Sequence, residues 1–300
     1  MAKKEVASNI YTKKGAKGDN KTSRIRDFWN KFKVQKKGVI SGIFILFLLL
    51  IILLGPIIAP YDSSETDYEA ILAGPSLDHW AGADSLGRDV FSRLIIGARI
   101  SMFVGLGSVL IGAILGTILG LISGFFGKWI DNLIMRTCDV LFSFPDMILA
   151  IGIIALLGPG LMNVVIAISI FSTPQFARIV RSVTLETKTN LYIESSQAIG
   201  ATRSRILFKH ILPSTFPSII VYFTMRIGSA IIIAASLSFL GLGAQPPSPD
   251  WGAMLSKGKE VLELAPHVTI FPGLAIFITV LAFNFFGDSL RDVLDPKIEE

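Results

Sequence analysis

Residues 38 to 59 form an uninterrupted apolar run, Gly38–Ala59, in which no side chain carries a charge. At about 1.5 Å per residue a helix of this length reaches roughly 33 Å, enough to cross a hydrocarbon core of about 30 Å. A cleaved signal peptide has a shorter apolar region and a shorter leader, so we expect the segment to be retained. The run 38–59 is therefore predicted to be a first transmembrane helix.

The rest of the chain has the composition of a membrane protein. Of its 300 residues 51% are hydrophobic and only 17% are charged, and the mean hydropathy is +0.61. These values are too apolar for an ordinary water-soluble domain, and glycine and proline mark the ends of further apolar stretches. We predict an all-α integral membrane protein with six transmembrane helices, the other five near 99–124, 130–157, 161–183, 215–243 and 267–288.

Lysine and arginine are distributed unevenly, which predicts an orientation. The N-terminal tail, the turn at 125–136, the segment 178–210 and the C-terminal tail hold about four times as many of them as 60–99 and 244–266 together. Cytoplasmic loops are the ones enriched in Lys and Arg. Six spans place both termini on one side, so we expect both in the cytoplasm, with loops 60–98 and 244–266 outside.

The sequence lacks the residues that several classes of function require. The net charge of +5 is spread over the tail and separate loops, which does not favour nucleic-acid binding. A lone Cys138 excludes an internal disulfide, and His79, His210 and His267 share no metal-site spacing. No phosphate-binding loop, nucleophile elbow or dinucleotide fingerprint is present. We expect no catalytic residue, metal or cofactor in this chain, so a partner must supply any energy.

The first 37 residues form a basic tail. Residues 1–23 have too few apolar side chains to offset the entropy of ordering, and we expect them to be disordered. Ile25, Phe28, Trp29 and Phe32 then recur at helical spacing among basic residues. This pattern predicts a short helix on the membrane surface, with a solvated charged linker as the alternative.

Small residues are spaced along the span at 99–124. Gly112, Gly116 and Gly120 are four apart, a spacing that lets two helix backbones approach closely in lipid. The pattern predicts packing inside a bundle and says little about chemistry.

The segment Thr184–Pro213 is polar enough to leave the bilayer but retains a helical pattern. One side is apolar, while Arg203, Arg205 and Lys209 supply a polar side. Gly200 divides the segment into two predicted helices. Such a helical pair is suited to docking against a cytoplasmic partner.

Part of this segment resembles the EAA loop of ABC importer permeases. The likeness covers Tyr192–Gly200 and continues to His210–Pro213. Glu194, Gly200, Leu212 and Pro213 fall on the family pattern, whereas Ser195 and Ser196 stand where two alanines are usual. Both departures are small residues that a helix accommodates. The resemblance implies that this loop, which includes His210, docks in a groove of an ATPase subunit.

Longer stretches resemble the peptide and nickel branch of that family, specifically its second, or C, permease subunit. The likeness extends from about residue 38 to the C-terminus and implies a type I ABC importer permease-like bundle, with a permease core at 99–289 and a tail at 290–300. The stretches are Ala83–Arg93, Gly97–Ser101, Ser236–Gly243, Gln245–Gly252, Phe271–Ala275 and Asn284–Asp292.

The resemblance also implies partners and a location. A homologous second permease, two ATPase subunits that bind ATP and Mg²⁺, and an external substrate-binding protein are expected in a bacterial cytoplasmic membrane. Peptide is the expected substrate, with nickel or a metal chelate as the alternative within the family. A stand-alone secondary transporter is the alternative outside it, but the sequence shows neither the inverted repeat nor the set of membrane-buried carboxylates arranged for ion coupling that is typical of that class.

Two ionisable residues are expected at membrane depth, where an uncompensated charge costs about 3 kcal/mol. Arg226, and Asp146 after a kink at Pro145, would either line the path or pair with an opposite charge. Asp250 and Trp251, in an outer loop, would either contact the binding protein or close the mouth of the pore.

Overall fold

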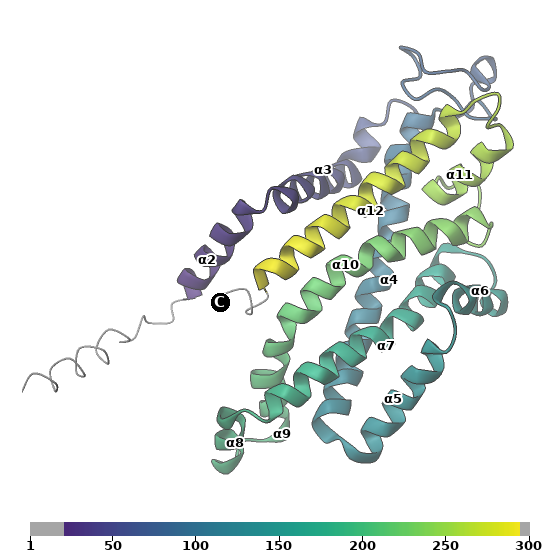
Figure 1. Ribbon diagram of the computed structural model, residues 1–300. Helices are drawn as coiled ribbons and strands as arrows, with labels where there is room; N and C mark the ends of the chain where they lie inside the picture. Colours follow the sequence, from purple (N-terminus) through teal and green to yellow (C-terminus); the bar gives the residue numbers. More distant parts are fainter. Residues whose placement is uncertain (1–20, 295–300) are drawn as a thin grey trace, which may run out of the picture.

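The computed structural model describes residues 21–294, and within this range every long element is a helix. Residues 1–20 and 295–300 lie outside it, and so do most of the expected disordered tail at 1–23 and the last part of the expected C-terminal tail. Residues 21–23, which were also expected to be disordered, form the start of a helix, so that part of the expectation is wrong. The helices (Figure 1) are α2 (Lys21–Val34), α3 (Lys36–Ile58), the 3-10 turn η2 (Tyr68–Ala70), α4 (Val90–Phe126), α5 (Lys128–Phe142), α6 (Asp146–Leu157), α7 (Leu161–Lys188), α8 (Leu191–Ala198), α9 (Arg203–Ile206), the π turn η3 (Leu207–Ile211), α10 (Leu212–Phe239), α11 (Trp251–Glu260) and α12 (His267–Leu294).

Five of the described helical segments are long and apolar enough to cross a membrane. They are α3, α4, α7, the continuous stretch α9 to α10, and α12, and the bent pair α5 and α6 makes a sixth if it counts as one span. The predicted all-α bundle of transmembrane helices is confirmed. The expected single helix at 130–157 is wrong, because α5 and α6 meet at an angle of 93°.

The break between α5 and α6 follows from the residues at 143–145. The Ser143 side chain donates a hydrogen bond back to the carbonyl of Val140 at 2.7 Å, which closes the end of α5. Pro145 has no N–H and stands at the position just before α6. Pro145 therefore begins a new helix in a new direction, where the sequence predicted only a kink.

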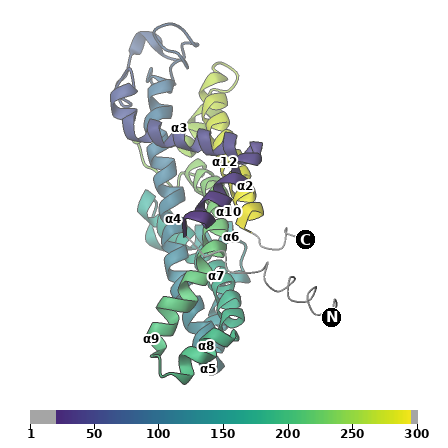
Figure 2. The ribbon, with the colours of Figure 1, turned by 90° about the vertical axis from the view of Figure 1, so that its left-hand side faces the viewer.

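Helices α4 and α7 lie against each other along most of their length (Figure 2). The predicted glycine stripe of α4 faces α7: a Cβ at Gly116 would lie 2.5 Å from the carbonyl oxygen of Thr173, and one at Gly120 equally close to that of Ala177. A Cβ at Gly112 or Gly124 would lie 2.8 or 2.7 Å from the Cβ atom of Ser172 or Thr184, respectively. The absence of side chains on this stripe allows the two backbones to approach to contact distance.

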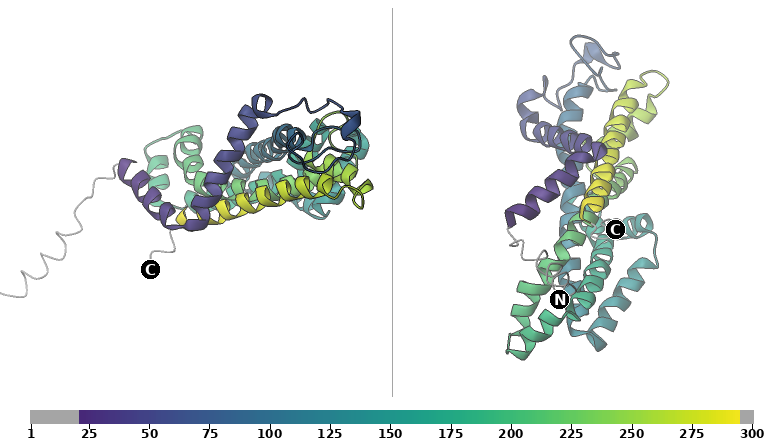
Figure 3. Two further views of the ribbon diagram at one scale, coloured as in Figure 1. Left: turned by 90° about the horizontal axis from the view of Figure 1, so that it is seen from above. Right: turned by 60° about the vertical axis from the view of Figure 1, so that its left-hand side comes forward.

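Helix α12 lies between α10 and α3 (Figure 3). Phe32 of α2 packs edge-on against Phe286 of α12, with ring centroids 5.8 Å apart, and is buried. The predicted helix after the N-terminal tail is therefore present, and its apolar side meets protein at this residue. Trp29, on the same helix, remains half exposed.

The elements that carry the candidate residues gather at two ends of an elongated molecule. Helices α8 and α9 form one end, and the loop 59–89 lies at the opposite end together with the N-terminus of α12 (Figures 1 and 2). The central helices connect these ends. We call them the α8–α9 end and the opposite end.

Candidate functional site

The α8–α9 end is fastened to the bundle at its base. The ammonium of Lys188, the last residue of α7, donates to the carbonyl of Phe125 in α4 at 2.7 Å and lies 5.5 Å from the centre of its ring. The hydroxyls of Thr187 and Ser214 are 3.0 Å apart and join the end of α7 to the start of α10. Three membrane helices are thus held together where the segment leaves them.

One side of the segment is buried in a small hydrophobic cluster. Ile193 of α8, Ile206 of α9 and Ile211 of η3 are almost fully buried. They pack with Phe125 of α4 and Val180 of α7. Full burial of a side chain of this size stabilises by about 1.5–3 kcal/mol. Three such side chains fix the segment to the ends of α4 and α7 as one unit.

The predicted division at Gly200 is confirmed. This residue has a φ of +81°, a conformation that costs glycine little and that other residues rarely adopt, and it ends α8. Thr202 then begins α9, because its hydroxyl accepts a hydrogen bond from the N–H of Arg205 at 3.3 Å.

The Leu212–Pro213 pair begins α10 rather than lying in a loop. The N–H of Leu212 reaches back five residues to the carbonyl of Leu207, which closes the wider π turn η3. Pro213 then occupies the first turn of α10, where its missing N–H is tolerated. His210 lies within η3, and its ring centroid is 6.1 Å from that of Tyr192 in α8.

The other side of the segment is exposed and apolar. Ile199 is 86% exposed, and Leu191, Phe208 and half of Tyr192 are also open. An exposed apolar patch rimmed by polar residues is typical of a protein interaction site. The exposed polar residues around it are Glu194, Arg203, Arg205 and Lys209.

The two serines that depart from the family pattern are satisfied within α8. Ser195 donates to the carbonyl of Leu191 at 2.9 Å, and Ser196 donates to that of Tyr192 at 2.8 Å. Their hydroxyls therefore need no partner. The helix is retained with serine at the positions where alanine is usual.

Arg226 of α10 and Asp146 of α6, both predicted at membrane depth, form one ion pair. The Nη2 atom lies 2.9 Å from the Oδ2 atom, and the side chains are 10% and 35% exposed respectively. Arg226 also lies over the ring of Phe171, and its Nε atom has no hydrogen-bond partner within residues 21–294. The sequence singled out both residues but treated them separately.

Two further ion pairs join α5 to α7, and sequence reasoning missed both. Arg181 binds Asp131 through two nitrogens, each 2.6 Å from a carboxylate oxygen. Arg178 binds Asp139 at 2.7 Å. The partners are about 40 to 50 residues apart in sequence, so no local spacing could reveal them.

Asp250 and Trp251 are buried at the opposite end, and both bind α4. The Asp250 carboxylate accepts from the Ser101 hydroxyl at 2.8 Å and from the N–H of Ala253 at 3.2 Å, which caps α11. The Trp251 indole donates to the carbonyl of Leu94 at 3.0 Å. The expectation that these two side chains contact a binding protein directly is wrong, because both are almost fully buried.

The described residues contain no group of three or more His, Cys, Asp or Glu placed to hold a metal ion. The contacts described above are ion pairs, hydrogen bonds and exposed apolar surface. Such groups can bind a partner and transmit movement.

The chain matches two families. Residues 116–300 match the family described as the inner membrane component of binding-protein-dependent transport systems. Residues 23–75 match the N-terminal transmembrane domain of oligopeptide transport permease C.

Similar proteins include curated relatives and solved structures. The glutathione transport system permease protein GsiD of Salmonella paratyphi A is 55% identical over 91% of each chain, and that of Escherichia coli O6:K15:H31 is 54% identical over 91% of this chain and 90% of its own. An inward-facing MetNI methionine ABC transporter chain has a TM-score of 0.55 at 21% identity, covering 68% of this chain and 97% of that one. A chain of an amino acid ABC transporter has a TM-score of 0.52 at 17% identity, covering 67% and 94%. These two structures share the fold.

Proposed function

This chain belongs to the family of inner membrane components of binding-protein-dependent transport systems, and from that premise we propose that it forms half of a translocation pathway for small peptides and is moved through α8 and α9. It is a multi-pass inner-membrane permease subunit of a peptide-type ABC importer, and ATP hydrolysis takes place in separate subunits. The observation that carries the proposed role of α8 and α9 is their two-sidedness: one side is fixed to the bundle and the other is exposed and apolar.

The proposed coupling follows from these contacts. An ATPase subunit binds the exposed side of α8 through Leu191, Glu194 and Ile199. Because Ile193, Ile206 and Ile211 are packed under α4 and α7, movement of α8 carries those helices with it. The bundle then changes between inward and outward openings as a rigid body. The loop from Glu194 to Pro213 is the coupling element in this proposal.

The proposed assembly has one copy of this chain, a homologous second permease, two ATPase subunits that bind ATP and Mg²⁺, and an external substrate-binding protein. The cation count supports cytoplasmic termini, with the α8–α9 end in the cytoplasm and loops 60–98 and 244–266 outside. We retain the boundaries 1–37, 38–59, 99–289 and 290–300 for the tail, first span, core and C-terminal tail. Helix α2 lies at the cytoplasmic membrane surface.

The side of the bundle that carries Asp146 is proposed to face the pathway or the second permease. A carboxylate that is 35% exposed at membrane depth would be costly against lipid, even when its other side is paired with Arg226. A second polar contact supports this orientation of the bundle: the Tyr222 hydroxyl of α10 donates a hydrogen bond to the amide oxygen of Gln175 in α7. Helices α6, α7 and α10 would then contribute to the pathway wall.

Glutathione is the first substrate to test. The names of the Salmonella and Escherichia relatives say that their systems transport glutathione. This chain and the Salmonella relative are 55% identical over nearly the whole of both sequences. We therefore propose that this chain transports the same class of substrate, a small anionic peptide.

The proposal is tested with the complex that co-purifies with this chain, reconstituted into vesicles with its binding protein outside and ATP inside. We expect a second permease and two ATPase subunits by mass spectrometry, and uptake of radiolabelled glutathione that requires ATP. Glu194→Lys should reduce uptake about tenfold or more, since reversing a charge at an interface costs several kcal/mol.

The matched control is Ser195→Ala, which removes only a hydroxyl bonded to its own helix and should transport normally. Both variants should be present in the membrane at the level of the parent chain. Normal uptake by Glu194→Lys would contradict the coupling assignment. Recovery of this chain alone, with transport that needs no ATP, would contradict the assembly.

A further inference from the structure

A cavity of about 410 Å³ opens at the end of the molecule opposite α8 and α9. Most of its wall comes from three segments: the loop and first turn of α4 from Asp84 to Arg93, the loop 241–248 with Pro246 and Pro247, and α11. Ser238 of α10 and Val268 of α12 complete it. These segments include stretches that the sequence singled out and that coupling does not use. The volume lies within the range of small-molecule sites, about 300–1,000 Å³.

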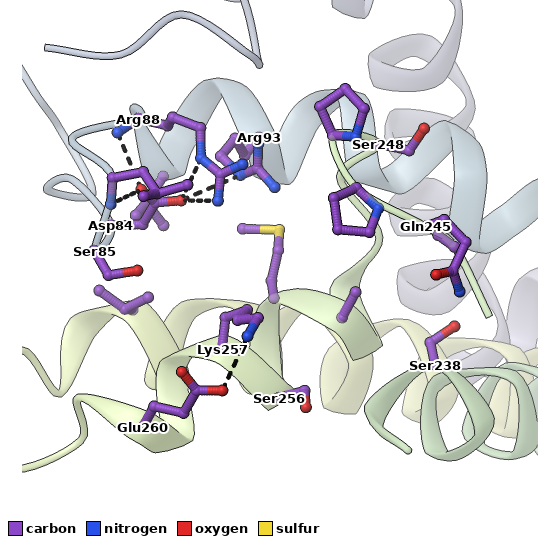
Figure 4. Close-up of a pocket in the computed structure, with 18 of the residues that line it drawn as sticks. Asp84, Ser85, Arg88, Arg93, Ser238, Gln245, Ser248, Ser256, Lys257 and Glu260 are labelled. Carbon is purple, nitrogen blue, oxygen red and sulfur yellow. Dashed lines mark hydrogen bonds and ion pairs between the residues drawn. The ribbon is translucent and has the colours of Figure 1, made fainter. Parts of the chain in front are cut away.

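Charged groups lie on two sides of this cavity. Figure 4 shows Asp84, Arg88 and Arg93 together on one side, and Lys257 with Glu260 on α11 across from them. Three cations therefore face two carboxylates. The cavity has an excess of one positive charge before any ligand enters.

The Asp84 carboxylate is already fully engaged. It accepts from the Nε atom of Arg88 at 2.8 Å and from the N–H groups of Leu86 and Arg88 at 2.8 and 3.1 Å. The Nη2 atom of Arg88 also lies 2.7 Å from its Oδ2 atom. Arg88 is thus the counter-ion that Asp84 binds directly. Little of that carboxylate is left to neutralise a second arginine.

Arg93 is the cation without a hydrogen-bonded carboxylate. Its side chain is 7% exposed, and its Nη1 atom donates to the carbonyl of Ser63 at 2.5 Å. Its Nε atom lies 3.6 Å from Asp84 Oδ2 and makes no hydrogen bond within the described part of the chain. A buried guanidinium in this state is costly unless an anion pairs with it, and Arg is suited to binding carboxylates through two nitrogens.

The remaining wall supplies an adaptable rim. Lys257 and Glu260 are 3.0 Å apart and mostly exposed, so their pair is worth little and Lys257 can turn to another anion. Ser85, Ser248 and Ser256 also line the cavity. No hydrogen bond joins their hydroxyls to another group within residues 21–294, so these hydroxyls can donate to a ligand.

We propose that this cavity is a carboxylate-binding site in which Arg93 and Lys257 pair with the acidic group of an incoming ligand and the wall serines donate hydrogen bonds to it. The carboxylate belongs either to a small peptide-like anion or to an acidic side chain of the external binding protein. The placement of this cavity on the outer face of the membrane rests on the proposed function. The charge pattern of the cavity does not.

The test uses the complete complex in lipid nanodiscs with Ser256→Cys, because Ser256 lines the cavity and is partly exposed. The thiol is labelled with two methanethiosulfonates, one carrying a sulfonate and one a trimethylammonium group. Their rates are normalised to those with free mercaptoethanol. A nearby cation activates the thiol for both reagents, so the ratio of the two rates reports the sign of the local potential. The unsubstituted chain, whose single Cys138 is buried, gives the background.

We expect the anionic reagent to react about tenfold faster than the cationic one at Ser256→Cys. At Gly74→Cys, an exposed position at the same end with open space around it, the ratio should be near that of free thiol. Adding Arg93→Gln should abolish the preference. Lys257→Gln, on the exposed rim, should reduce it and serves if Arg93→Gln fails to fold.

Protection separates the two sources of the carboxylate. Slower labelling in glutarate, but not in neutral glutaramide, supports a small anionic ligand. Protection only by the purified binding protein supports an acidic side chain of that protein. Equal rates for the two reagents, or an anion preference that survives both substitutions, would overturn the site. These rates need no ATP, so failure here is distinct from failure to transport.

Discussion

Removing one partner of the Arg226–Asp146 pair tests whether the pair only joins α6 to α10 or also serves transport. Asp146→Leu leaves a guanidinium that is 10% exposed without its counter-ion. Breaking a buried pair costs about 3–5 kcal/mol of unfolding free energy. Because Asp146 is 35% exposed and already partly hydrated, we expect a loss below this range, about 2–3 kcal/mol.

Arg226→Met should cost less, about 1–2 kcal/mol, because the carboxylate left behind is partly exposed. The double variant Asp146→Leu/Arg226→Met replaces the pair by apolar groups and should recover most of the loss. The measurement is the unfolding free energy of each purified variant in mixed micelles of increasing sodium dodecyl sulfate. The double-mutant cycle should give a coupling of about 3 kcal/mol between the two residues.

Transport by the same four proteins then separates the roles. If the pair only joins two helices, the double variant regains uptake together with stability. If Asp146 and Arg226 contribute to the pathway, as we propose, the double variant regains stability and still transports at least about tenfold more slowly. Single variants as stable as the parent chain would refute the argument from burial, and additive losses in the double variant would refute the pairing.

Three further predictions concern the scaffold. Gly116→Ala should lower the unfolding free energy by about 1–3 kcal/mol, because its Cβ would lie 2.5 Å from atoms of α7. Gly107→Ala on the same helix meets open space and should leave the unfolding free energy unchanged or raise it slightly. The micelle titration compares the two variants. Gly200→Pro should reduce ATP-driven uptake about tenfold with normal membrane insertion, because proline cannot adopt a φ of +81°, and normal uptake would show that the turn between α8 and α9 is dispensable. Asp250→Ala should cost about 1–2 kcal/mol through loss of the α11 cap and of the bond from Ser101, and a melting temperature equal to that of the parent would contradict this.

The membrane helices could be predicted because the signal for them is local. An apolar run such as 38–59 must span or be buried whatever surrounds it, and α3 occupies nearly the same residues. The run at 130–157 is also apolar enough to be a candidate span, although it carries charges that 38–59 lacks, and a break in a helix depends on whether neighbours can satisfy the freed backbone groups. At Ser143 and Pro145 the chain closes one helix and starts another, which hydropathy does not record.

The candidate site was predictable in part for the same reason. Gly200 carries a local backbone requirement, so the division between α8 and α9 followed from the sequence. Pairing between distant residues has no local signal: Arg226 and Asp146 are 80 positions apart, and Arg181 and Asp131 are 50 apart. Burial of Trp251 was hidden similarly, because α4 covers it from more than 150 positions away in sequence.

The glycine stripe between α4 and α7 limits where the protein can deform. Backbones in direct contact have no layer of side chains that could tilt or change rotamer to let one helix slide along the other. A displacement applied at the end of α7 is therefore delivered to its far end, roughly 40 Å away at 1.5 Å per residue, with little loss. We therefore expect deformation at breaks between helices, such as the 93° corner between α5 and α6, rather than along the contact of α4 with α7.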